Sequence, residues 1–217
     1  MAAASSSPAL CVCDDATFWP WRTWPDFARL PPTETMVVVP VAGYAERGDL
    51  PLDAEEGVLM RVLQRAARLF ERPDRLLVVP PLRFVLGPVG TGVFAVEPPL
   101  AHAFIAEVCR SVAASGFRRI VLCNASPANE ELCDVAARDL RIDHGLQLFC
   151  VHLGALGLAL GASDPAGLAQ IARLLDGTAS DALERHGRHL ASLLGEIVRR
   201  PALPGGGHLG PVRPSQP

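Results

Sequence analysis

The sequence predicts an α/β protein, a three-layer α/β/α sandwich with a mostly parallel central sheet. Two observations support this fold class. Four short runs rich in Val, Leu and Ile alternate with longer segments in which apolar residues recur at helical spacing, as in a chain of βαβ units. The short runs are also apolar at nearly every residue, which is typical of strands buried on both faces of a parallel sheet.

Each short run has the length and the residue types of a strand. The first is rich in β-branched residues, which favour extended structure, and the others are dominated by Leu, Ile and Val. The predicted strands comprise residues 35–41 (TMVVVPV), 74–81 (DRLLVVPP), 118–124 (RRIVLCN) and 146–153 (LQLFCVHL).

The longer segments have helical periodicity and recognisable ends. Pro73 stops the first of them, and Gly116 is placed to end the second. Asp164 before Pro165 begins the fourth, and Gly177 ends it. The predicted helices comprise residues 56–70, 100–116, 130–140, 163–177 and 180–199.

The composition predicts one folded domain with loose ends. Of the 217 residues, 49% are hydrophobic and 20% charged, which is enough for an ordinary core. The start is rich in Ser and small residues, and the end (PALPGGGHLGPVRPSQP) combines Pro and Gly too densely for a helix or strand. We therefore expect an α/β domain over residues 18–200, with a flexible N-terminus (1–17) and a flexible tail (201–217).

Net charge and cysteine usage limit the partners and the cellular compartment that we expect for the protein. A net charge of −3 gives no attraction to nucleic acid or anionic lipid, and no apolar run reaches the roughly 18 residues of a membrane span. The six cysteines lack paired zinc spacing and the density of a disulfide scaffold. We expect a cytoplasmic protein without nucleic-acid or membrane partners. Cys11 and Cys13 are interpreted as isolated thiols, with a redox or metal-binding pair as the alternative.

Two loops are placed to form a site. In open parallel sheets, ligands bind outside the carboxyl ends of the strands, in the loops that lead into the helices. The loop after the first predicted strand reads AGYAERGDLPLDAEE (42–56), and the loop after the third reads NASPANEE (124–131). Both are rich in polar side chains, so a site is expected where they meet.

These loops and their flanks carry a family resemblance. TWPDF (23–27), PVAGYAERGDLPLDAEE (40–56), VVPPLRFVLGP (78–88) and GFRRIVLCNASPAN (116–129) follow one another in that order. In order and spacing they resemble elements of the creatininase family of metal-dependent amidohydrolases, among them Thr-Trp-Pro-Glu, Pro-Val-Gly-Ser and Asn-Gly-His-Gly-Gly-Asn. The resemblance extends over about residues 23–200 and implies a creatininase-like α/β/α fold.

The resemblance also implies what has changed. Family members hold two divalent ions that activate a water and polarise an amide carbonyl. The family's ligand positions fall here on residues unsuited to that task, namely Ala45, Arg47, Ser126, Ala128 and Leu190, while Asp49 stands where the family has a histidine and Glu55 keeps a carboxylate. A permanently cationic arginine is incompatible with two divalent ions in the same place. We therefore expect no metal, no other cofactor and no catalytic residue.

The former metal-site loops remain candidates for ligand binding. The candidate residues are Arg47, Asp49, Glu55, Asn124, Ser126 and Asn129. A guanidinium makes bidentate contacts with carboxylates, so Arg47 is a candidate ligand anchor. Structural alternatives stay open: Arg47 pairs with Asp49, Asp53 or Glu55, the acids form a solvated cluster at a helix N-terminus, and the asparagines form turns or caps.

Three functions follow from these expectations. The first is a catalytically inactive creatininase-like protein that binds a peptide or acts as a scaffold in the biosynthesis of a modified peptide natural product. Its partners would be a peptide or another biosynthetic protein, in a homo- or hetero-oligomer. The second is a metal-independent amide hydrolase or cyclase that uses Glu55, His186 or His189 as acid–base groups. The third is a structural pseudo-subunit of an active homologue.

An aromatic cluster stands apart from these loops. Trp19, Trp21 and Trp24 are the three tryptophans of a chain in which 6% of residues are aromatic. We expect them to pack against the edge of the sheet or against a neighbouring subunit, because such residues often anchor interfaces.

Overall fold

The computed structural model describes residues 17–83, 86, 95–158 and 160–201. Its centre is a four-stranded sheet in the order β2-β1-β3-β4, and every neighbouring pair is parallel. The strands are β1 (Met36–Val41), β2 (Leu76–Val78), β3 (Arg119–Asn124) and β4 (Gln147–His152). Every residue of β1 and β3 is buried, because these central strands are covered on both faces.

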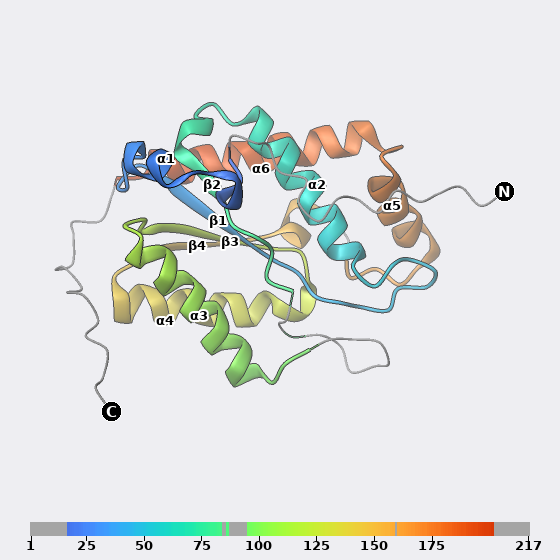
Figure 1. The fold of residues 1–217 in the computed structure, drawn as a ribbon. Helices are drawn as coiled ribbons and strands as arrows, with labels where there is room; N and C mark the ends of the chain where they lie inside the picture. Colours follow the sequence, from blue (N-terminus) through green and yellow to red (C-terminus); the bar gives the residue numbers. More distant parts are fainter. Residues whose placement is uncertain (1–16, 84–85, 87–94, 159, 202–217) are drawn as a thin grey trace.

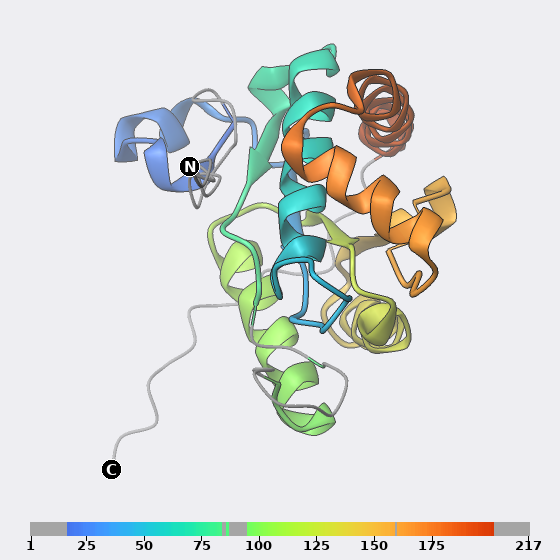
Figure 2. The same cartoon turned by 90° about the vertical axis from the view of Figure 1, so that its right-hand side faces the viewer.

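Helices cover both faces of this sheet (Figure 1). One face packs against α2 (Ala54–Leu69), α5 (Pro165–Asp176) and α6 (Ser180–Arg199), and the other against α3 (Pro98–Ala114) and α4 (Glu130–His144). Figure 2 shows the two layers on either side of the strands. The predicted three-layer α/β/α sandwich is therefore confirmed.

Most predicted element ends are also confirmed. Asp164 caps α5, its Oδ1 accepting hydrogen bonds from the backbone N–H groups of Ala166 and Gly167 at 3.0 Å each. Gly177 follows α5 in the left-handed conformation, with φ of 83°. The sequence places the end of α4 too early, because that helix continues to His144.

The second strand is shorter than predicted. Residues 73–75 form a 3₁₀ turn, η2 (Pro73–Arg75), and pairing with β1 stops at Val78. Pro80 and Pro81 have no N–H to donate, so the regular ladder ends before them. Leu82 then returns to the end of β1, where its carbonyl accepts a hydrogen bond from the Ala42 N–H at 3.1 Å.

The N-terminal segment forms structure that periodicity did not predict. It contains a 3₁₀ turn, η1 (Trp19–Trp21), and a short helix, α1 (Trp24–Arg29), with a capping box between Thr23 and Asp26. Phe18, rather than a tryptophan, pairs with Val78 at the β2 edge of the sheet, and Trp24 is 84% exposed. The other predicted contact, with a neighbouring subunit, stays a prediction.

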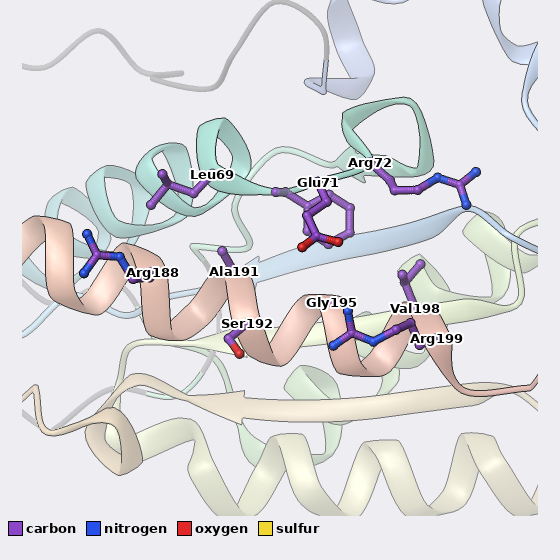
Figure 3. Close-up of a pocket in the computed structure, with 10 residues that line it drawn as sticks. Leu69, Glu71, Arg72, Arg188, Ala191, Ser192, Gly195, Val198 and Arg199 are labelled. Carbon is purple, nitrogen blue, oxygen red and sulfur yellow. The ribbon is translucent and has the colours of Figure 1, made fainter.

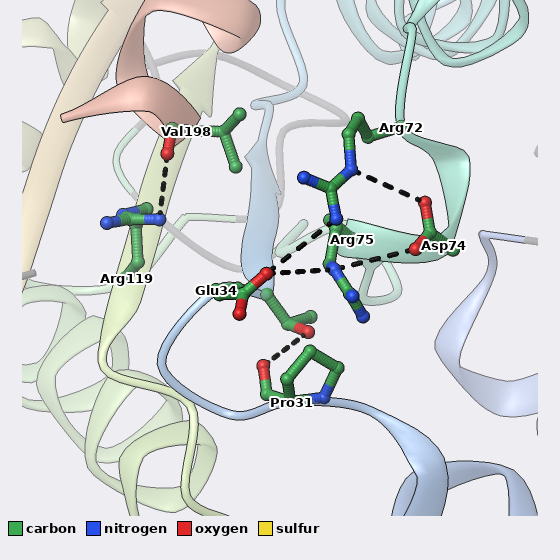
Figure 4. A network of polar contacts seen from close by, with 8 residues as sticks. Pro31, Glu34, Arg72, Asp74, Arg75, Arg119 and Val198 are labelled. Atoms are coloured by element: carbon green, nitrogen blue, oxygen red, sulfur yellow. Dashed lines mark hydrogen bonds and ion pairs between the residues drawn. The ribbon is translucent and has the colours of Figure 1, made fainter. Parts of the chain in front are cut away.

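Polar contacts tie the chain together at the amino ends of the strands (Figure 4). Glu34 contacts Arg72 and Arg75 at 3.7 and 3.3 Å. Arg119, at the start of β3, donates to the carbonyls of Val198 and Arg200 at 3.1 and 2.7 Å. These bonds fix the end of α6 beside the sheet.

The structure bears on two further expectations, the lack of a membrane span and the flexible chain ends. Among the described helices, none combines the length and the apolar character needed to cross a bilayer. The expected flexible segments fall almost entirely on residues 1–16 and 202–217, which lie outside the described residues, as do Cys11 and Cys13.

Candidate functional site

The two predicted loops meet at the carboxyl edge of the sheet. Val41 and Asn124 are paired at the ends of β1 and β3, so the loops after these strands start side by side. One carries three of the candidate residues and the other carries the remaining three: Arg47, Asp49 and Glu55 follow β1, whereas Asn124, Ser126 and Asn129 end or follow β3. The two loops therefore meet as expected, and the ligand-binding role of these residues stays a prediction.

The first loop is organised around a buried ion pair between Arg47 and Glu55. Both Nε and Nη2 of Arg47 contact Oε1 of Glu55, with Nε at 3.2 Å. The Glu55 side chain is 1% exposed because α2 begins against the sheet, and the side chain of Arg47 is 14% exposed. Within the described residues, Glu55 Oε2 has no hydrogen-bond partner. The Arg47 guanidinium therefore neutralises the charge of a carboxylate that is buried from solvent.

A second ion pair neutralises the next residue of α2. Arg83 donates from Nε and Nη2 to the two carboxylate oxygens of Glu56, at 2.7 Å each. Glu56 is buried, whereas Glu46 and Asp49 are exposed. The expected solvated acidic cluster is therefore wrong for Glu55 and Glu56. Sequence reasoning missed Arg83, because a single arginine in a loop carries no signal of its distant partner.

The second loop is organised by Asn124. Its Oδ1 accepts from the Ser126 N–H at 3.1 Å, and its Nδ2 donates to the Ser126 carbonyl at 2.8 Å. These two bonds fix the amide orientation, so Nδ2, at 3.2 Å from His152 Nδ1, donates to that nitrogen as well. His152 Nε2 then carries the proton and donates to Asp134 Oδ1 at 3.2 Å. Asn124 is thus the turn former that one alternative proposed, and it links β3 to β4.

A small polar cradle lies between the two loops, above Gly43. A Cβ at this glycine would lie 3.1 Å from the Leu86 carbonyl oxygen, 3.1 Å from Ser126 Oγ and 3.5 Å from Asn129 Nδ2. Asn129 is fully buried, and its Oδ1 accepts from the Leu86 N–H at 2.9 Å. Its Nδ2 has no hydrogen-bond partner within the described residues. The cradle thus presents a carbonyl oxygen, a hydroxyl and an amide N–H that has no partner within the described residues.

The comparisons with known proteins identify the family. The family model described as "Creatininase: Creatinine amidohydrolase" matches residues 21–170. The chain belongs to the creatininase family. A comparison with curated proteins gave no match.

Solved creatininase structures share the fold. A creatinine amidohydrolase (creatininase) is 20% identical, with a TM-score of 0.56, and the match covers 72% of this chain and 63% of that one. A variant creatininase in a Zn–Zn form is 22% identical with a TM-score of 0.55, covering 70% and 62%. A protein from Bacteroides fragilis NCTC 9343 carrying the creatinine amidohydrolase name is 10% identical with a TM-score of 0.63, covering 88% and 100%. The chain therefore spans less than two thirds of the first two proteins.

One group of potential metal ligands occurs within the described part of this creatininase-family chain. The ligand atoms of Asp134, Cys150 and His152 lie within 4.8 Å of one another. A metal-bound imidazole donates its second N–H to an acceptor, whereas the second ring nitrogen of His152 faces the amide donor of Asn124. The group fits a structural cross-link between α4 and β4 better than a metal site.

The two histidines proposed as acid–base groups differ in environment. His189 is exposed, whereas His186 is 4% exposed. Burial lowers the pKa of His186, and nearby Arg185 lowers it further. A contact with the Leu156 backbone opposes this shift without meeting hydrogen-bond geometry. His186 is therefore held neutral beside the turn that follows β4.

A cavity elsewhere in the molecule lies outside the candidate site. It has a volume of about 530 Å³ and lies between the C-terminal halves of α2 and α6, where Leu69, Ser192 and Arg199 are among its lining residues (Figure 3). These helix ends lie at the amino side of the sheet. The cavity is thus separated from the loops that carry Arg47 and Asn129.

Proposed function

We propose that this creatininase-family chain is a peptide-binding or scaffold protein rather than a metal-dependent amidohydrolase. The Arg47–Glu55 pair carries the proposal. In the resemblance to the family, both residues stand at metal-ligand positions, and here they bind each other. A peptide in the biosynthesis of a modified peptide product, in the cytoplasm, is the occupant that family analogy favours.

The residues at the carboxyl edge fit two divalent ions poorly. A guanidinium cannot lose its proton, so Arg47 places a fixed positive charge where cations would be held. One oxygen of Glu55 and both oxygens of Glu56 already accept hydrogen bonds from arginines. Metal ions that bound these carboxylates would displace Arg47 and Arg83 and leave both guanidinium groups without these carboxylate partners. Leaving a buried charged group unpaired costs several kcal/mol of free energy.

The cradle above Gly43 supports binding of a peptide amide. An N–H buried without a partner costs about 1–3 kcal/mol, and a ligand oxygen placed above Gly43 would remove that cost at Asn129. The Ser126 hydroxyl can donate to the same oxygen. A peptide group has the required acceptor, and its N–H can donate to the Leu86 carbonyl oxygen in the same cradle.

A metal titration tests the first part of the proposal. Calorimetry with Zn²⁺ or Mn²⁺, together with metal analysis of the purified protein, is expected to show no stoichiometric pair of ions. The triple variant Ala45→Glu, Arg47→His, Ser126→His restores family ligands and is expected to gain metal affinity. Two tightly bound ions in the unaltered protein would contradict the proposal.

A matched substitution tests the second part. Calorimetry against peptides encoded beside the gene is expected to find a binder, and Asn129→Asp should weaken it because the acceptor to Leu86 is kept while the donor is lost. Two other outcomes would replace the proposal. Amide hydrolysis that depends on Glu55, His186 or His189 would favour the metal-independent enzyme, and a stable complex with an active homologue would favour the pseudo-subunit.

A further inference from the structure

An aromatic groove opens at the amino side of the sheet, away from the loops of the candidate site. It has a volume of about 570 Å³, and the residues that define it here are Trp19, Trp24, Phe27, Pro32 and Phe117. The Trp19 ring lies 4.8 Å from Phe27 and 5.5 Å from Phe117, measured between ring centroids. These rings form a packed wall.

The groove leaves a large aromatic side chain uncovered. Trp24 is 84% exposed, although it begins α1 beside the packed rings. Gly116 has a φ of 98°, and its Cα lies close enough to Pro32 that a Cβ there would be 3.4 Å from the proline ring. This positive φ brings the chain from α3 back against the groove before Phe117. Exposed indole and aromatic walls are the surface that polyproline II segments bind.

The chain carries a segment of matching chemistry at its C-terminus. Pro211, Pro214 and Pro217 recur at intervals of three in PVRPSQP. A polyproline II helix has three residues per turn, so this spacing places all three prolines on one face. The segment also has few N–H groups to leave unpaired when it docks.

The C-terminal segment starts at the same end of the molecule as the groove. Figure 1 shows the end of α6 at the end of the molecule that carries α1, and Figure 2 shows α2 between the two helices. Arg119 Nη2 is 2.7 Å from the Arg200 carbonyl oxygen, and Phe117 lies two residues before Arg119. Phe117 packs on the face that α3 and α4 cover, whereas the end of α6 packs on the other face, so the tail has to pass the edge of the sheet to reach the groove. At the polyproline II rise per residue, the ten residues from Pro201 to Pro211 could span about 31 Å.

We propose that residues 211–217 dock in the aromatic groove of the same molecule, with the three prolines against Trp24 and its neighbours. The proposal does not depend on the function of the carboxyl-edge site. It assigns a role to two features that the site leaves unused, the exposed tryptophan and the proline-rich tail. It also gives the tail a fixed position, whereas its composition alone predicts a flexible one.

Intrinsic fluorescence tests this proposal in the full chain, because all three tryptophans lie at positions 19, 21 and 24. The variant Pro211→Ala, Pro214→Ala, Pro217→Ala is expected to show a red-shifted emission maximum and faster acrylamide quenching. The control Ser215→Ala, Gln216→Ala keeps the prolines and should match the unaltered protein. A peptide of residues 208–217, added to the proline variant, should restore the original spectrum.

Each other outcome overturns the proposal. Unchanged emission and quenching in the proline variant, with the fold intact by circular dichroism, would show that the tail does not cover the groove. A spectrum that changes on dilution together with molecular mass would show docking in a second copy. In a third outcome, the tryptophans lose their protection from acrylamide quenching when residues 1–16 are deleted and keep it in the proline variant. That result would assign the groove to the N-terminal segment.

Discussion

At the scale of single residues, the choice of partner for Arg47 separates what sequence predicts from what it leaves open. The charge and the loop position indicated an ion pair, and three acids were available. The structure selects Glu55 because a turn folds the loop back on itself, with Gly48 at φ of 54° and the Leu50 N–H bonded to the Arg47 carbonyl. At this turn Gly48 lies against α5, where a Cβ would be 3.2 Å from Cδ1 of Leu168, and no local pattern encodes that contact.

Replacing Arg47 should destabilise the protein far more than replacing an exposed arginine. Arg47→Met leaves the Glu55 carboxylate buried without its partner and is expected to cost about 3 kcal/mol of the free energy of unfolding. The control Arg188→Met breaks an exposed pair with Glu184, where Arg188 is 70% exposed, and should cost less than about 0.5 kcal/mol. Urea denaturation measures both. Equal losses would mean that the Arg47–Glu55 pair is solvated.

At the scale of elements, hydrophobic periodicity predicted the strands and long helices but not where they touch. The N-terminal helix α1 was missed because a six-residue helix is too short to show a period. The packing of α2 against α6 was also unpredicted, although Gly187 lies at the contact. A Cβ there would meet Cγ of Arg65 and would lie 2.8 Å from its Cβ. A lone glycine in a helix indicates such close packing only once the partner helix is known.

Two glycines of α6 should therefore respond in opposite ways to the same substitution. Gly187→Ala gains helix propensity but forces α2 and α6 apart, so we expect a net loss of about 1–3 kcal/mol. Gly195→Ala meets no atom closer than the flexible end of Arg199, at 3.5 Å, and should be neutral or stabilising by up to about 1 kcal/mol. Thermal and urea unfolding of the two variants give the comparison. A stabilising Gly187→Ala would show that the helices are not in close contact.

At the scale of the whole molecule, the sequence predicted the sandwich and the edge at which its polar loops gather. That edge was predictable because parallel strands bring their carboxyl ends together whatever the side chains are. The side-chain contacts that join the loops at this edge were not predictable. The Glu56–Arg83 pair and the Asn129–Leu86 bond join segments that are 27 and 43 residues apart, and their formation depends on the complete fold.

The two helical layers share one sheet, so they should unfold together, and buried cysteines can report this. Cys123 belongs to the core beneath α2 and α6, whereas Cys109 and Cys133 belong to the core beneath α3 and α4. Burial raises the pKa of Cys109 and Cys123 to about 12, so almost no reactive thiolate forms in the folded state at pH 8. Modification then requires opening of the core, and the free energy of that opening sets its rate.

We expect these three cysteines to react with iodoacetamide at matched rates that rise in parallel with urea, as peptide mapping by mass spectrometry can measure. Half-buried Cys150 serves as the comparison, because a local opening at the β4 edge would expose it first. If Cys109 and Cys133 reacted much faster than Cys123, the α3–α4 layer would open by itself. The shared central strand β3 argues against that, because Val121 and Cys123 pack into one core while Ile120 and Leu122 pack into the other.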